Sequence, residues 1–449
     1  MKKKYVFLLL AAAALFFWAA GQTRLVLTKA RERQNIVLSD QSANNPPFVV
    51  LTTVALGGFR GLVVDILWMR LISLQKEGKV FEIAQLADWI TKLEPQLATV
   101  WAFHAWNMAY NISILYVNPE HRWLWVKNGI QLLRDNGLKY NPDDPILYRE
   151  LGWIYQHKIG QSWDDMHFFY KHKLAKEMDD LFRAPRPDYS KPDSQSKKMR
   201  GEYKLFPEIM RSIEEYYGQL DWRLPETHAI YWAYRGLHSA AGKDTSLCDH
   251  MICQSMAAEF LHGRLFINPD AGVYMTTPQL DLLPGTIRAY EDALKREKMD
   301  YLRMSYVNFL SEAVFVFHVY GDDQSALKLF DKMLSAEPKL KAQMSFEKYL
   351  LKCDQFNIAE LPMADAVAWI EGMLYQSHAD SHGVEANKVN KAKNAAGLRD
   401  KAFSLWKQYA ANPQNRKSSE IFPDFEMLDR QAKQRALNRK EAALYSAPK

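Results

Sequence analysis

Apolar residues recur at intervals of three and four along most of this chain, which is the spacing of an amphipathic helix. From Phe48 onward the pattern is helical in this way, with few strand signals and no regular alternation of apolar and polar positions. Helices are predicted, for example, over residues 304–320, 363–376 and 394–409. We therefore expect an all-α fold for the body of the protein.

The first 21 residues have a different pattern, in which three lysines precede an apolar run over residues 5–21. This run is just long enough to span a bilayer, because a spanning helix needs about 17–25 apolar residues. Phe16, Phe17 and Trp18 stand where the aromatic belt of a membrane interface would lie. The small residues at 19–21 would equally suit a cleaved signal peptide. We favour a retained signal anchor. The expected location is the inner (cytoplasmic) membrane, single-pass, with the body periplasmic or otherwise extracytoplasmic.

A polar stem over residues 22–47 follows the apolar run and ends in two asparagines and two prolines. The next segment, 48–74, is very apolar, and a second membrane span is one interpretation of it. Arg60 and Asp65 argue against that span, because a charge at the middle of a bilayer is costly. We interpret this segment as the buried first helices of the body, packed against the membrane surface.

The net charge of +6 over 449 residues is concentrated at the N-terminus. Residues 1–33 hold seven Lys and Arg but a single acid, which leaves 51 basic and 51 acidic residues in the remainder. A neutral body is unsuited to gripping the phosphate backbone, so nucleic acid is not an expected partner. Positive charge beside an apolar run instead favours a membrane surface.

Motifs for metals, cofactors and nucleotides are missing from the sequence. Cys248 and Cys253 are not spaced as zinc ligands are, and no second pair follows them. The glycine-rich stretch at 57–61 lacks the Gly-Lys-Ser/Thr of a phosphate-binding loop. We therefore expect no cofactor, no metal ligand and no catalytic residue.

A turn-and-helix pattern is clearest in YGDDQSALKLFDKMLSAEP, residues 320–338. Gly321 ends one helix, and Ala326, Phe330 and Pro338 follow at intervals of five, four and eight residues. A small residue lets two helices approach closely, an aromatic ring fills the space beside it, and a proline ends the helix. The stretch therefore predicts a turn followed by the second helix of a pair.

The same pattern recurs upstream, at Gly78 and Pro95, at Gly152 and Tyr155, and at Trp232 and Gly236. These positions resemble those of the tetratricopeptide repeat (TPR) family over roughly residues 62–340. The resemblance implies a TPR-like α-solenoid of stacked helix-turn-helix units, here in a divergent membrane-anchored bacterial member. It also implies a non-catalytic scaffold that binds segments of protein partners.

The pattern departs from a regular array, because the units vary from roughly 34 to 47 residues. Residues 184–204 interrupt it with prolines, serines and charges, and we expect an inserted, mobile loop there. The chain is thereby divided into N-terminal TPR-like helices over 48–183 and C-terminal ones over 205–355. Capping helices and a charged tail are expected over 356–449.

The first helices of stacked repeats line a concave face on which partner segments lie. Residues that the repeat register places on this candidate protein-binding groove are Asn107, Asn111, Arg149, Trp153, His157, Asn308, Ser311 and Phe315. Asn107 and Asn111, four residues apart, could bond to the backbone of a partner. Each of these residues taken alone is more typical of ordinary protein surface.

The stretch DWRLPETHAIYWAYRG, residues 221–236, is the densest collection of polar and aromatic side chains in the sequence. Pro225 suits the first position of a helix, and the aromatic residues after it suit helix packing. Asp221, Arg223 and His228 remain unexplained as a polar cluster, and an Asp221–Arg223 contact that fixes the loop is the simplest interpretation.

The function expected from these features is a membrane-anchored scaffold or adaptor that binds protein segments and supports assembly of an envelope complex. Its partners would be envelope proteins, together with the membrane through the N-terminal helix. Two alternatives stay open: a structural subunit of a membrane complex, and a hydrolase-type enzyme with a site near residues 221–228.

Overall fold

A computed structural model describes most of the chain after residue 58. The described residues are 59–189, 197–239, 242–268, 273–297, 299–339, 345–353, 357–381, 388–413 and 422–446, with Leu15, Gln22 and Asn415. The predicted anchor, the stem and the start of the apolar segment 48–74 therefore lie outside the described residues, apart from two single positions. Within the described part, no helix is both long and apolar enough to cross a bilayer.

The described chain is mostly helical, as the apolar periodicity predicted. The helices of its first half are α3 (Arg60–Lys76), α4 (Val80–Leu93), α5 (Ala98–Trp106), α6 (Pro119–Gln131), α7 (Leu138–Tyr140), α8 (Pro145–Trp153), α9 (His167–Phe182) and α11 (Pro207–Tyr217). Those of its second half are α12 (Pro225–Ser239), α13 (Ser246–His262), α14 (Leu283–Arg296), α15 (Asp300–Val319), α16 (Asp323–Ala336), α17 (Phe346–Cys353), α18 (Met363–Ser381), α19 (Lys388–Ala411) and α20 (Phe425–Ser446).

Three helices continue without a break into wider π-helical turns. Asn107–Ile112 extends α5, Leu132–Gly137 extends α6, and Ile154–Gly160 extends α8. A further π-helical turn covers Met199–Tyr203. Such turns shift the side chains that follow around the helix axis, and they occur often at functional sites.

A β-hairpin corrects the prediction that the body is all-α. Strands β1 (Arg264–Asn268) and β2 (Val273–Thr277) pair antiparallel after α13, with Arg264 opposite Thr277. The second strand has the β-branched and aromatic residues that favour strands. A five-residue strand is too short to interrupt a helical periodicity, which is why the pattern along the chain missed it.

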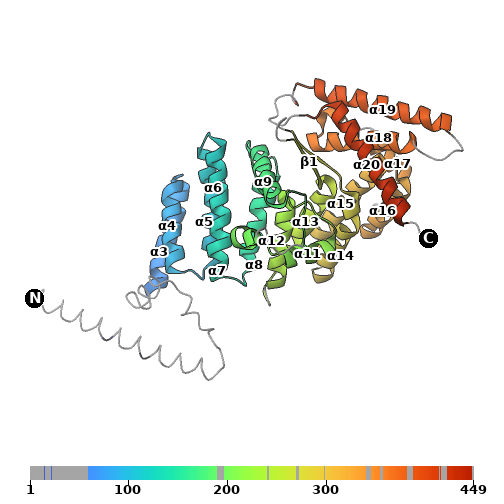
Figure 1. Ribbon diagram of the computed structural model, residues 1–449. Coiled ribbons are helices and arrows are strands. Elements are labelled where there is room, and N and C mark those ends of the chain that lie inside the picture. The colour runs from blue at the N-terminus through green and yellow to red at the C-terminus, as the bar shows by residue number, and fades with distance from the viewer. Residues whose placement is uncertain are drawn as a thin grey trace, which may run out of the picture.

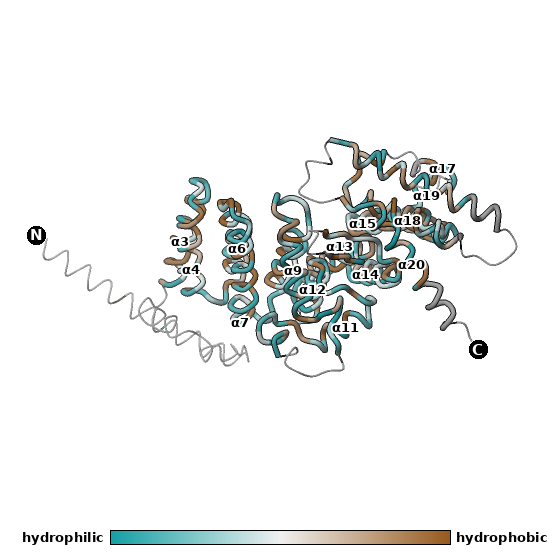
Figure 2. The backbone as a smooth tube through the Cα atoms, turned by 45° about the horizontal axis from the view of Figure 1, so that its top comes forward, coloured by the Kyte–Doolittle hydropathy of each residue, from teal (hydrophilic) through white to brown (hydrophobic). Residues whose placement is uncertain are grey.

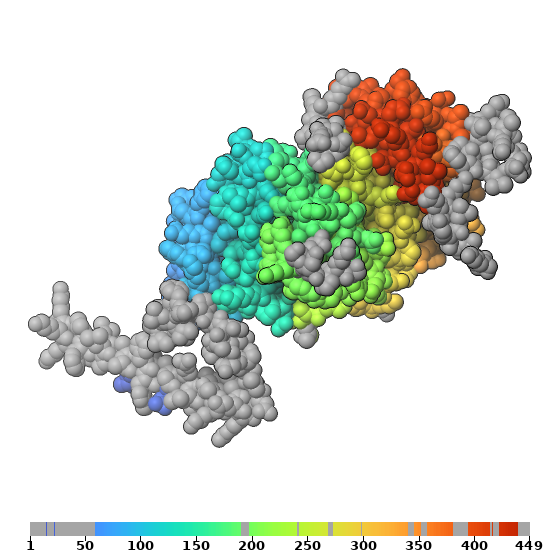
Figure 3. All heavy atoms as spheres, viewed as in Figure 1, coloured from blue at the N-terminus to red at the C-terminus, as the bar shows by residue number. Residues whose placement is uncertain are grey.

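Neighbouring helices pack in pairs that follow one another along the molecule. α3 packs on α4, α12 on α13, and α15 on α16, while α5 and its π-helical extension pack on α6. Contacts between α4 and α5, between α5 and α8, and between α8 and α12 join one pair to the next. Figure 1 shows these helices side by side in a row, and Figure 3 shows successive segments as successive bands across the body.

The residues that suggested a helix pair at 304–338 have the expected structural roles. Gly321 adopts a positive φ of 80°, which glycine tolerates best, at the turn between α15 and α16. The Asp322 side chain accepts a hydrogen bond from the Ser325 amide and so caps α16. Ala326 and Phe330 are buried. The pattern thus identified a real helical hairpin.

The core of the described residues is divided into one large cluster and two small ones, the smallest of which contains Ala175, Leu224 and Tyr274. The large cluster runs from Ala98 in α5 to Ala432 in α20, and a separate small one joins α3, α4 and Val100. Figure 2 shows hydrophobic and hydrophilic positions alternating along the helices, with the hydrophobic ones recurring turn by turn. The N-terminal helix pair is therefore held to the body by fewer buried contacts than the later helices.

The interpretation of segment 48–74 as buried helices is wrong for most of α3. Only Val64, Leu71 and Leu74 of this helix are buried. One side of α3 instead exposes a row of large apolar residues: Phe59, Leu62, Ile66, Met69 and Ile72. They recur every three to four residues, so they share one helix face. We refer to these five residues as the α3 apolar face.

Two further segments differ from what the sequence predicted. Within the expected loop at 184–204, residues 184–189 and 197–204 are described, and Met199–Tyr203 forms a π-helical turn there. Residues 184–189 have no helix or strand, as expected, and the Pro185 carbonyl accepts a hydrogen bond from the Trp222 amide at 2.8 Å. The C-terminal region is more than a charged tail, because α20 packs on α18 and buries Leu428 and Ala432. Its sequence is weakly amphipathic because a buried arginine, Arg435, stands on its inner face.

Candidate functional site

Three of the predicted groove residues form a continuous stack on α8 and its π-helical extension. The Arg149 guanidinium lies 4.7 Å from the centre of the Trp153 ring. That ring stacks on His157 with 4.5 Å between centroids and 12° between planes. Arg149 is also paired with Glu150. These contacts place the three side chains on one face of the helix, and whether that face is a binding groove stays a prediction.

The stack extends across to α5 and its π-helical extension. Tyr110 on the extension of α5 forms a 3.2 Å hydrogen bond between its hydroxyl and His157 Nδ1, and it stacks on Trp106 at 5.8 Å. On the other side, Trp163 stacks on His157 at 6.3 Å and is 80% exposed to solvent. We call these five aromatic side chains the ring ladder: Trp106, Tyr110, Trp153, His157 and Trp163. Trp106, Tyr110 and Trp163 were not predicted as site residues, although the aromatic content of 101–110 was a usable signal.

An ion network lies under the ladder and fixes the loop that carries Trp163. Lys158 is paired with Asp164, and Arg122 Nη1 lies 3.2 Å from the same carboxylate. The two cations hold the pKa of Asp164 below its usual value against the opposing effect of burial. The pKa of His157 is lowered by burial and by Lys158, so its ring is neutral near pH 7. The ladder thus presents neutral aromatic faces.

The two predicted asparagines serve the fold rather than an open groove. Asn107 is fully buried, and its amide donates to the Val80 carbonyl at 3.1 Å. Asn111 donates to the Asn107 side chain at 2.9 Å. The prediction that this pair bonds to a partner's backbone is therefore wrong for Asn107, whose amide instead joins the extension of α5 to the start of α4.

The remaining predicted groove residues lie elsewhere, on α15. Ser311 and Phe315 line a cavity of about 240 Å³, and Asn308 is exposed one turn before it. The cavity, which we call the α15 cavity, is lined by Leu261, His262, Pro278, Ser311, Glu312, Phe315, Val316, Tyr349, Leu361, Asp365, Ala368 and Trp369. It therefore lies where α13, α15, α17 and α18 meet, and it is separate from the ring ladder.

The α15 cavity combines aromatic walls with two carboxyl groups. Phe315 meets Trp369 edge to face at 5.1 Å, and the Tyr349 hydroxyl donates to the Ser311 carbonyl at 2.7 Å. Burial of the carboxyl group, with a smaller effect from Asp365, raises the pKa of Glu312 to about 7, although the residue as a whole is exposed. Burial also raises the pKa of Asp365. Sequence reasoning missed both acids because they are 53 positions apart.

The polar cluster at 221–228 is occupied by contacts within the protein. Arg223 donates to both oxygens of Asp221, at 2.9 and 2.7 Å, so the contact expected from the sequence is present. His228 is 1% exposed, stacks on Tyr155 at 4.8 Å and donates from Nε2 to the Trp222 carbonyl at 3.0 Å. Burial lowers the pKa of His228 to about 4. Asp221 and Arg223 therefore contact each other, whereas His228 packs against other helices and does not join them.

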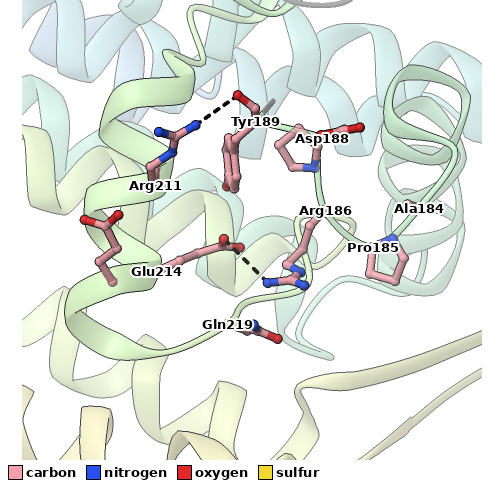
Figure 4. Close-up of a pocket in the computed structure, with 10 residues that line it drawn as sticks. Ala184, Pro185, Arg186, Asp188, Tyr189, Arg211, Glu214 and Gln219 are labelled. Atoms are coloured by element: carbon pink, nitrogen blue, oxygen red, sulfur yellow. Dashed lines mark hydrogen bonds and ion pairs between the residues drawn. The ribbon is translucent and has the colours of Figure 1, made fainter. Parts of the chain in front are cut away.

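A larger and more open hollow, of about 760 Å³, lies between residues 184–189 and α11 (Figure 4). Figure 4 shows Arg211 directed at the Tyr189 carbonyl and Arg186 directed at Glu214, at 2.9 and 3.8 Å. Glu214 also accepts a 2.9 Å hydrogen bond from the Trp222 ring nitrogen. The charged groups that line the hollow are therefore largely paired with groups of the protein, and the hollow resembles an ordinary solvated surface.

Metal and thiol chemistry find no support in the described region. No three His, Cys, Asp or Glu side chains there lie close enough together to hold a metal ion. Cys248 and Cys253 are free and buried, and burial raises the pKa of the Cys248 thiol to about 12. Both therefore behave as core residues.

Comparisons with protein-family models, with curated proteins and with solved structures give no match to this chain.

Proposed function

We propose that this protein is a membrane-anchored TPR-like scaffold that binds a protein segment along the ring ladder and supports assembly of an envelope complex. The observation that carries the proposal is the ladder itself, which crosses from the extension of α5 to the extension of α8. Aromatic faces that span two successive helix pairs offer a continuous surface to an extended or helical partner segment. Trp, Tyr and Arg are also the residues most enriched at binding hot spots.

The packing of the helix pairs supports the TPR-like solenoid. The α15–α16 hairpin is one example of this packing. A second is the close approach of α12 to α8 at Gly236, where a Cβ would lie 2.7 Å from Tyr148 Cβ. Trp232, one turn earlier on α12, is fully buried. In the TPR pattern the small residue and the aromatic residue have these same two roles, close helix approach and filling of the space beside it.

The α3 apolar face supports a position beside the membrane. It follows directly in the chain after the apolar residues 48–58, and the polar stem 22–47 connects that segment to the predicted anchor. An exposed row of large apolar residues on a helix is typical of a surface that is covered in the working state. In the proposed arrangement the lipid surface covers it, and the helix pairs extend from there into the compartment outside the membrane.

Site-directed photocrosslinking in native membranes tests the proposal. A photoreactive residue in place of Trp163 should crosslink to a discrete set of envelope proteins. The matched control replaces Leu351, which is 61% exposed on α17 and distant in sequence from the ladder. An adaptor predicts crosslinks from position 163 that change with growth conditions, whereas one fixed, stoichiometric partner set indicates the structural-subunit alternative.

A synthetic copy of the crosslinked segment provides the second step. It should bind the full chain, and Trp153→Ala should weaken that binding. If position 163 crosslinks no more than position 351 does, or the segment binds equally well after Trp153→Ala, the ladder is not a binding surface. A reporter fused after residue 449 that is active only in the cytoplasm would contradict the proposed location.

A further inference from the structure

We infer that the α15 cavity is a specificity pocket for one cationic side chain, lysine or arginine, of the partner segment. The inference rests on the proposed function, because it assumes that protein segments bind this chain, and it names a second contact point away from the ring ladder. Its volume of about 240 Å³ lies below the roughly 300–1,000 Å³ of cavities that take drug-sized ligands. A single side chain is the occupant that fits this size.

The carboxyl groups of the cavity have no fixed positive partner in the part of the chain that the structure describes. Across the described residues, no Lys or Arg forms an ion pair with Glu312 or Asp365. His262 Nε2 lies 3.8 Å from an Asp365 oxygen, but burial lowers the pKa of this histidine to about 4, so its ring is neutral near pH 7. Two acids in a confined space without a cation form a site of negative potential.

The walls of the cavity suit the same ligand. The rings of Phe315, Trp369 and Tyr349 line it together with the acids. Aromatic faces attract ammonium and guanidinium groups, and they also pack against the methylene stems of Lys and Arg. An entering cation would favour the charged form of a neighbouring carboxyl group, so binding and ionisation of Glu312 should reinforce each other.

The exposed face of α15 leads a segment toward the cavity. Met304 and Asn308 are exposed. The cavity residues Ser311, Glu312 and Phe315 follow three to seven positions after Asn308, which places them on the same side of α15. A partner backbone that lies along this side can therefore place one side chain in the cavity. A metal ion is a poorer occupant, because the described residues hold no group of three suitable ligands.

Selection from a library of random eight-residue peptides on the full chain tests the inference. We expect the enriched peptides to carry Lys or Arg at one position. The Glu312→Gln/Asp365→Asn double variant should bind these peptides about tenfold or more weakly, because each lost charge-assisted contact reduces the affinity by this order. Glu347→Gln on α17 is the matched control, since Glu347 is exposed and does not line the cavity.

The outcomes separate this inference from the proposed function. If the enriched peptides have no common basic position, or bind the double variant equally well, the cavity does not recognise a cation. The proposed function, binding of protein segments, would still hold in that case. If no peptide is enriched, the proposed function fails, and titration with N-acetyl-arginine amide then decides the chemistry of the cavity. If the probe binds the unmodified protein but not the double variant, the ligand of the cavity is a free small cation and not a protein segment. If the probe does not bind, both the proposed function and the cation pocket are overturned.

Discussion

Arg435 of the C-terminal helix α20 donates a 2.9 Å hydrogen bond to the hydroxyl of Tyr320, 115 residues earlier at the end of α15. The same guanidinium lies 3.1 Å from the Glu371 carboxylate on α18 and donates to the Pro278 carbonyl at 2.7 Å. All of these side chains are buried. One charged residue therefore joins the last helix to three other parts of the fold.

Replacement of Arg435 should strongly destabilise the C-terminal helices. Arg435→Ala leaves the Glu371 carboxylate buried without its partner, which costs about 3–5 kcal/mol. The free energy of unfolding from urea titrations of the full chain measures this loss. Arg399→Ala is the control, because Arg399 is half-exposed and pairs with Asp429 at 3.1 Å. It should cost about 1 kcal/mol or less, and an equal loss in both variants would contradict a structural role for the buried pair.

The Arg435 pair also shows what the sequence cannot supply. Residues 425–446 are rich in charge, so their periodicity predicts a weakly amphipathic tail, yet α20 packs into the large core. The partners of Arg435 are 64 and 115 residues away, and nothing local distinguishes it from a surface arginine. The Glu312–Asp365 pair was missed for the same reason. By contrast, Arg149, Trp153 and His157 were found because their relationship is local, within one helix.

Replacement of Gly236 should destabilise the junction between α8 and α12. A methyl group at this position would lie 2.7 Å from Tyr148 Cβ and 2.8 Å from Cys248 Sγ, closer than packed atoms allow. We expect Gly236→Ala to lower the free energy of unfolding by about 1–3 kcal/mol. Gly397→Ala in α19 is the matched control, since nothing lies within 4 Å of the new methyl group. That control should stabilise the protein by about 0.5–1 kcal/mol, and a similar effect at both positions would argue against close helix approach at Gly236.

The buried His228 should make the protein less stable in acid. Its pKa in the folded protein is about 4, below the value of 6.5 expected when it is exposed, because burial disfavours the charged ring. The unfolded chain therefore takes up a proton below pH 6.5 that the folded chain refuses until about pH 4. Stability from this group is complete above pH 6.5 and is lost as the pH falls through this window, by about 2 kcal/mol between pH 7 and 5.

His228→Gln removes this titration, so its free energy of unfolding should fall less between pH 7 and 5 than that of the unmodified protein. Glu259→Gln is a control of opposite sign. Burial raises the pKa of Glu259 well above its usual value, so its contribution to stability is largest in acid and is lost as the pH rises above about 4.5. Removing it should make the acid loss steeper. Identical pH profiles for His228→Gln and the unmodified protein would contradict the assignment.

Trp163 allows binding to be separated from folding. Its ring is 80% exposed, so Trp163→Ala should change the free energy of unfolding by no more than about 0.5 kcal/mol. If the ring ladder is the binding surface, the same change should weaken binding of the crosslinked segment by about 2 kcal/mol, which is a roughly thirtyfold loss of affinity. Isothermal titration of the segment measures this loss. Trp89→Ala on α4, half-exposed and outside the ladder, should leave the affinity unchanged, and an equal effect of both changes would point to a nonspecific loss.

The α3 apolar face should lie against lipid in the full chain. Its five residues lie on one side of α3 and its N-cap, directly after the apolar residues 48–58, so lipid is the partner that we expect to cover this side. A fluorophore attached through Met69→Cys, with Cys353→Ser to remove one native thiol, should be quenched by spin-labelled lipid chains in vesicles. A fluorophore attached through Leu351→Cys, an equally exposed position on α17, should be protected from them. Since both labels sit on the same anchored chain, equal quenching at the two positions would show that α3 faces water.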